Sequence, residues 1–215
     1  MEVDNSGVRH LYTAVAFGEL VNPRNLIAIS SVAIALLASL PALEAQAMPK
    51  PNDEKRTVTQ VLDRTLSNTE SEFVPAAEAM PEDKYSFVPT GGEFKGVRTY
   101  AQQIKHVAAV NYEIAAAILE EKPPAEIGDE SGPDSIKSKA EVLKYLKDSF
   151  AYAHKAAMSI NDSNAVNTVK SPFGEGRVTR LGLATIIVTH CADHYGQMVV
   201  YLRMNGIVPP ASRGQ

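Results

Sequence analysis

The chain has 215 residues, 45% of them hydrophobic and 21% charged, which is the composition of a globular protein long enough for one well-cored domain. Its net charge of -4 and its interspersed acidic and basic residues offer no basic patch, so we expect no nucleic-acid partner. Cys191 is the single cysteine, which excludes an intramolecular disulfide and a cysteine-rich structural zinc site.

Residues 1–47 are predicted to be a presequence. An uncharged apolar run at 26–40 follows Arg24 and precedes Ala45-Gln46-Ala47, the layout of a secretory signal peptide. We therefore predict a signal peptide at about 24–47 and export to the periplasm or the extracellular space. The alternative is an uncleaved membrane anchor, although about 15 residues is short for a span of about 20.

The residues before this run are too acidic for a signal peptide, since they include Glu2, Asp4 and Glu19. They suggest that the true translation start lies near Val21 or Leu20. The mature chain, residues 48–215, contains no further run that could span a membrane.

Four helical segments are expected after residue 48, separated by proline and glycine. The first covers 57–80 and contains Pro75, which we expect to kink or interrupt it. The second covers 96–121 and stops at Lys122-Pro123-Pro124.

The third predicted helix runs from Pro133-Asp134-Ser135 to about Ile160, and the fourth covers 179–204 before Asn205-Gly206. No stretch shows sustained strand alternation. The sequence therefore predicts an all-α fold, a four-helix bundle after an N-terminal signal segment, in which sites are built from side chains that project inward from facing helices.

Three histidines form the candidate metal site. His190 and His194 are four residues apart on the fourth helix, so both imidazoles lie on one face about 6 Å apart along the axis. His106 on the second helix supplies the third ligand if the two helices are neighbours. Three protein ligands leave one coordination position open for ligand exchange or chemistry, and imidazole suits zinc, nickel, copper and iron alike.

Motifs elsewhere extend this pattern. They are His106, then His190-x3-His194-Tyr195-Gly196-Gln197, Tyr201-Leu202-Arg203, Gly206, Pro209-Pro210 and, earlier, Met80-Pro81-Glu82-Asp83-Lys84-Tyr85. With these motifs the chain from about Val58 to Ser212 resembles the DinB-like superfamily, which includes the YfiT-type bacillithiol transferases and mycothiol-dependent enzymes. The resemblance implies a four-helix bundle, often a homodimer, that binds zinc or nickel through the three histidines. Tyr195 departs from the arginine often found there, which leaves an anion contact by that residue unsupported.

Other polar residues have competing interpretations. Gln197 is predicted to contact a bound ligand or to orient a histidine ring, with helix packing as the alternative. Asp193 projects about 100° away from His194 and is expected to face solvent or an interhelical partner and not the metal. Cys191 and His154 are interpreted as packing residues, although His154 could supply a fourth ligand. Tyr112 and Glu113 are candidates for lining a pocket. The alternatives are that Tyr112 packs between helices and that Glu113 is a charge exposed to solvent.

The resemblance and the open metal position favour a metal-dependent enzyme that transfers a thiol to an electrophile or hydrolyses a small-molecule substrate. A zincin protease is excluded because Cys191 stands where His-Glu-x-x-His requires glutamate. The alternatives are a non-catalytic metal- or ligand-binding bundle in the cell envelope and a purely structural bundle.

Overall fold

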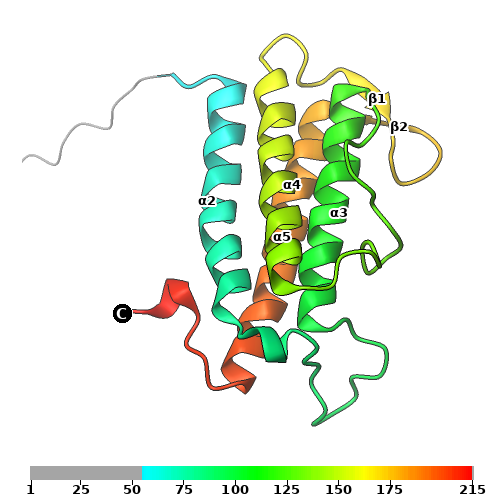
Figure 1. The fold of residues 1–215 in the computed structure, drawn as a ribbon. Helices are drawn as coiled ribbons and strands as arrows, with labels where there is room; N and C mark the ends of the chain where they lie inside the picture. Colours follow the sequence, from blue (N-terminus) through cyan, green and yellow to red (C-terminus); the bar gives the residue numbers. More distant parts are fainter. Residues whose placement is uncertain (1–54, 215) are drawn as a thin grey trace, which may run out of the picture. The chain divides into compact units, whose positions relative to one another are not determined.

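Four long helices dominate residues 55–214, the part of the chain that the computed structural model describes (Figure 1). They are α2 (Val58–Ala79), α3 (Tyr100–Leu119), α4 (Lys139–Ser159) and α5 (Arg180–Met204). The short elements are η1 (Glu82–Lys84), β1 (Thr168–Lys170), β2 (Arg177–Thr179) and η2 (Pro210–Ser212). The predicted all-α four-helix bundle is confirmed. The predicted signal peptide and the boundary at residue 48 lie outside the described residues.

A capping box starts each of the first three helices. The hydroxyl of the capping residue accepts from the backbone N–H three residues on, and the side chain of that later residue accepts from the backbone N–H of the capping residue. The pairs are Thr57 with Gln60, Thr99 with Gln102, and Ser138 with Glu141. The predicted starts of α3 and α4 were therefore a few residues early, since these helices begin at Tyr100 and Lys139. The capping residue fixes each start more sharply than the apolar periodicity does.

Pro75 lies inside α2 and does not interrupt it. A proline has no N–H, so the carbonyl of Ser71 loses its helical hydrogen bond. The neighbours Phe73, Ala76 and Ala77 are fully buried in the core. Their packing holds this turn in the helix despite the missing bond.

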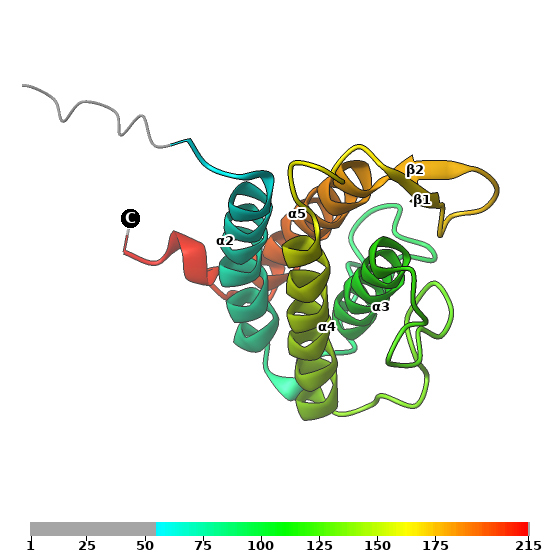
Figure 2. The same ribbon diagram turned by 90° about the horizontal axis from the view of Figure 1, so that it is seen from above.

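Seen from above, α2 and α3 lie on opposite sides of the bundle, with α4 and α5 between them (Figure 2). Both α2 and α3 pack against α4 and α5, so α2 and α3 lie at diagonal corners. The chain between them is fastened by two tyrosines: Tyr85 donates its hydroxyl to the carbonyl of Ala77 at 2.7 Å, and Tyr100 donates to that of Ala76 at 2.6 Å. These bonds tie the start of α3 and the segment before it to the last turn of α2. The crossing makes α3 a neighbour of α5.

A two-stranded hairpin precedes α5. This hairpin was not predicted from the sequence. β1 and β2 pair antiparallel, with Val169 opposite Val178, and each strand has three residues. Strands this short show too little alternation to be recognised. Val169 is buried in the core, and Thr179 at the end of β2 caps α5 by accepting from the N–H of Gly182 at 3.1 Å. The hairpin therefore fixes where α5 begins.

None of the helices within residues 55–214 combines the length and the apolarity that crossing a membrane would require.

Candidate metal centre

The three predicted histidines come together between α3 and α5. Their ligand nitrogens lie within 4.8 Å of one another, and Nε2 of His106 is 3.1 Å from Nε2 of His190. Two imidazole nitrogens on one tetrahedral zinc ion are about 3.3 Å apart, given bond lengths of about 2.0–2.1 Å. The rings pack edge to face, with centroids 4.5 Å apart for His190 and His194. The arrangement is compatible with a shared divalent cation.

The ring of His194 is oriented by Gln103, a buried residue one turn before His106 on α3. The amide oxygen of Gln103 lies 2.6 Å from Nδ1 of His194 and can accept its proton. The amide nitrogen of Gln103 donates to Oε1 of Gln197 at 2.8 Å, and Gln197 donates to Asp193 at 3.0 Å. With the proton held on Nδ1, the Nε2 atom of His194 is free to bind a cation.

Burial favours the neutral form of all three imidazoles. It lowers the pKa of His190 to about 3, with the neighbouring His194 and His106 acting in the same direction. Burial and then His106 lower the pKa of His194 to about 4, and burial also lowers the pKa of His106. Neutral imidazole is the form that binds a metal. At neutral pH the cluster therefore presents three unprotonated donors.

Nδ1 of His190 is buried and has no hydrogen-bond partner among the described residues. A buried polar atom without a partner costs free energy and is rare, except where a site retains it for a functional reason. It belongs to the same ring whose pKa is lowest. A cation at the cluster would meet Nε2 of His190, which faces His106, so the fit to a cation rests on the donor set of three neutral imidazoles within 4.8 Å of one another.

Arg98 is a nearby charged group that the sequence analysis missed. Its guanidinium donates to the backbone carbonyl of Glu130 at 2.8 Å and forms an ion pair with the Glu130 carboxylate at 2.9 Å. Its positive charge contributes to the lowered pKa of all three histidines. Arg98 precedes α3 and has no fixed helical spacing to His106, so only the tertiary structure brings it near. Gln103 lies one turn before His106, but its contact with His194 on α5 likewise follows only from the tertiary structure.

Among the other candidates, Asp193 is exposed, as expected. Gln197 reaches the cluster through Gln103, and its predicted contact with a bound ligand stays a prediction. Cys191 is fully buried, 3.5 Å from Oδ1 of Asn111, and burial raises the pKa of its thiol to about 12. This supports its interpretation as a packing residue, since only a thiolate is reactive.

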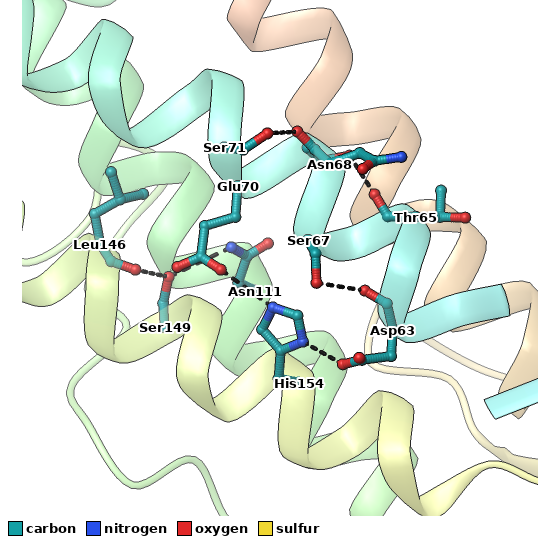
Figure 3. Close-up of polar contacts among 11 residues, drawn as sticks. Asp63, Thr65, Ser67, Asn68, Glu70, Ser71, Asn111, Leu146, Ser149 and His154 are labelled. Atoms are coloured by element: carbon teal, nitrogen blue, oxygen red, sulfur yellow. Dashed lines mark hydrogen bonds and ion pairs between the residues drawn. The ribbon is translucent and has the colours of Figure 1, made fainter. Parts of the chain in front are cut away.

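His154 lies away from the cluster, between α2 and α4 (Figure 3). Its Nδ1 is 2.6 Å from Asp63 and its Nε2 is 3.1 Å from Glu70, so both ring nitrogens are engaged by α2. The structure therefore gives His154 a role in joining two helices, as its packing interpretation anticipated, and not that of a fourth ligand.

A cavity of about 270 Å³ opens beside His106. Its walls come from α3, through Ala109, Val110 and Glu113, and from the loop of residues 127–130. Glu113 is thus a pocket residue. Tyr112, the other candidate, packs against the rings of Tyr145 and Tyr152 in the core.

Comparisons with known proteins agree on one family. The model of the DinB superfamily matches residues 65–198, whereas no curated protein matches the chain. A DinB-like protein from Bacillus cereus ATCC 10987 is similar in structure, with a TM-score of 0.56, 14% identity and coverage of 72% of this chain and 96% of that one.

Two further solved structures are similar. A conserved protein from Enterococcus faecalis has a TM-score of 0.55 and 16% identity, over 70% of this chain and 98% of that one. A DinB-like protein from Bacillus subtilis has a TM-score of 0.52 and 17% identity, over 68% of this chain and 92% of that one. At these identities the structures show a shared fold. Together with the match of the family model, they show that the chain belongs to the DinB superfamily.

Proposed function

We propose that this protein is a metal-dependent enzyme whose centre is a divalent cation, zinc or nickel, held by His106, His190 and His194. The convergence of three neutral imidazoles from two helices within 4.8 Å is the observation that carries the proposal. A bound cation would lower the pKa of a thiol or a water at the open position, or polarise a substrate oxygen. The reaction class is the transfer of a thiol to an electrophile or a hydrolysis.

The surrounding residues support this reaction by preparing the ligands. Gln103 holds the His194 ring with Nε2 directed to the cluster, so no reorientation is needed when the cation binds. The charge of Arg98 disfavours protonation of the histidines and favours an anionic reactant near them. The cavity beside His106 gives a small molecule access to the centre.

The test is metal analysis of protein purified without an affinity tag, followed by turnover assays. We expect about one zinc or nickel per chain in the wild type and loss of the metal in His190→Ala. Activity is assayed with low-molecular-weight thiols plus an electrophile and with ester and amide substrates. His154→Ala is the matched control, because His154 lies outside the cluster, and it should retain the metal. A His190→Ala variant with unchanged metal content would contradict the proposal.

The same assays separate the enzyme from a non-catalytic binding protein. Tight, stoichiometric metal without turnover of any of these substrates would favour a metal- or ligand-binding bundle. Retained fold and stability in alanine variants of all three histidines, without metal in the wild type, would favour a purely structural bundle.

We also propose that the protein is exported and works outside the cytoplasm as a homodimer. The apolar run at 26–40 and the Ala45-Gln46-Ala47 motif support export. Sequencing the N-terminus of the native protein tests it: a start near Met48 supports cleavage, whereas a retained run indicates an anchor. Light scattering of the mature protein tests the dimer.

A further inference from the structure

The cavity beside His106 adjoins a larger one along α3. The second cavity has a volume of about 690 Å³ and lies under the loop between β1 and β2. Glu113 and Ile127 line both cavities, so their side chains mark the junction. We call the combined cavity the Glu113 groove. It runs from the histidine cluster to the hairpin.

One face of α3 forms the floor of this groove. Glu113 is seven residues after His106, which is two helical turns, so the two side chains share a face and are separated by about 10 Å along the axis. Ala116 and Ala117 carry the floor onward, and Pro123 and Ile127 provide apolar walls. A ligand in the groove would lie along an apolar surface and would pass the carboxyl group of Glu113 between the two ends.

Most of the charges that line the groove are already paired. Glu120 forms an ion pair with Arg180, Glu121 pairs with Lys155 and accepts from Tyr152, and Glu130 pairs with Arg98. Asp129 accepts from the backbone N–H of Ser131. The rim near the hairpin carries the exposed Lys170 and Glu175, of opposite charge.

Glu113 differs from these groups because it is partly buried and forms no hydrogen bond or ion pair with another described residue. Burial and then the charge of Glu130 raise the pKa of its carboxyl group, so its ionised form is disfavoured as the groove stands. A cation beside Glu113 would compensate both effects. Among the described residues of the groove, Glu113 is therefore the one partly buried and unpaired carboxyl group, and its complement is a cation on a ligand.

We propose that the Glu113 groove binds an elongated organic cation, whose ammonium group pairs with Glu113 while its apolar body lies on α3 and its other end reaches the three-histidine centre. The inference rests on the proposed function for the end of the ligand that meets the metal. It adds a substrate class, an amine about 10 Å long, and a specificity-determining residue, Glu113.

Calorimetric titration of the zinc-loaded protein tests this with three eight-carbon thiols that differ only at the far end: an ammonium, a methyl and a carboxylate. We expect the aminoalkanethiol to bind about tenfold more tightly than the alkanethiol, and the mercaptoalkanoate to bind most weakly. In Glu113→Gln the three affinities should converge with zinc content unchanged. Asp148→Asn is the control, because Asp148 is an exposed carboxylate on α4 outside the groove, and it should keep the preference.

A fourth probe, octyltrimethylammonium, separates this inference from the metal proposal, since it cannot bind zinc. If the wild type binds it and Glu113→Gln does not, the cation site stands even where zinc and thiols fail to bind. Thiols that bind zinc with equal affinity whatever their far end would overturn the inference and leave the metal centre intact. Thermal melting of Glu113→Gln verifies that the variant is folded.

Discussion

At the scale of single residues, the centre depends on contacts behind the ligands as much as on the ligands. His190 and His194 were identified from their helical spacing, and His106 from its place on another predicted helix and from the family resemblance. Gln103 was not identified, although it fixes the tautomer of His194. An amide has many packing roles in a helix, so its type and position alone do not reveal this contact.

Gln103→Ala should weaken zinc binding by about 10- to 100-fold, the usual effect of removing a group that orients a metal-bound histidine. The helix itself should tolerate alanine. Competition with a chromogenic chelator measures the affinity. Gln197→Ala, which removes the residue next in the hydrogen-bond chain, should cause a smaller loss. An unchanged affinity in Gln103→Ala would show that the ring is held by packing alone.

At the scale of elements, loop 126–133 closes over α3 beside His106. Lys105 is almost fully buried, and its ammonium donates to the carbonyl of Pro133 at 2.8 Å. Gly132 has a φ of 77°, and a Cβ there would lie 2.6 Å from the Cβ of Lys105. The loop reaches α3 only because this residue has no side chain.

Gly132→Ala should therefore lower the free energy of unfolding by about 2 kcal/mol or more, from backbone strain plus displacement of the loop. Gly96→Ala is the matched control, since its φ of 81° imposes the same kind of strain with nothing within 4 Å of the added Cβ. That variant should lose about 1 kcal/mol. Urea unfolding compares the two. Equal losses would mean that the contact with α3 adds nothing.

His154 joins α4 to α2, because its ring lies between Asp63 and Glu70 (Figure 3). His154→Leu should lower the free energy of unfolding by about 1 kcal/mol, because both contacts disappear while the volume is retained. Part of this loss should vanish in 1 M salt if it is electrostatic, since the screening length is then about 3 Å. Zinc content should not change, because the histidine cluster lies between other helices.

At the scale of the whole molecule, stability and metal occupancy are coupled to protons. An unfolded histidine has a pKa near 6.5, whereas the folded, metal-free protein lowers it to about 3 at His190 and about 4 at His194. As the pH falls below about 6.5, the unfolded chain binds protons that the folded chain does not. Unfolding is then favoured progressively down to about pH 4 for the His194 contribution and about pH 3 for that of His190, and above pH 7 these groups contribute no pH dependence.

The metal-free protein should therefore unfold at a lower urea concentration at pH 5 than at pH 7. In His190→Gln/His194→Gln this part of the difference should disappear, because glutamine does not titrate. Urea midpoints of both proteins at the two pH values are the measurement. The same pH dependence in wild type and double variant would show that these histidines are not buried in neutral form.

The sequence by itself determined the local features of this protein: four helices, the stops at glycine and proline, and a histidine pair on one helical face. These follow from short-range steric and hydrogen-bonding preferences, which the periodicity of apolar residues and the capping residues reveal over a few turns. The predicted start of a helix was too early where the capping box lay inside a longer polar stretch, as at Ser138.

Only the tertiary structure decided which helices are neighbours. The diagonal crossing between α2 and α3 brings His106 to α5, places Gln103 on His194 and leaves Glu113 facing a groove. These relations join residues about 90 positions apart in the chain, as between Gln103 and His194. They depend on the rotation and packing of whole helices against a shared core. Helical periodicity predicts which face of a helix is buried, but it does not predict which helix packs against that face.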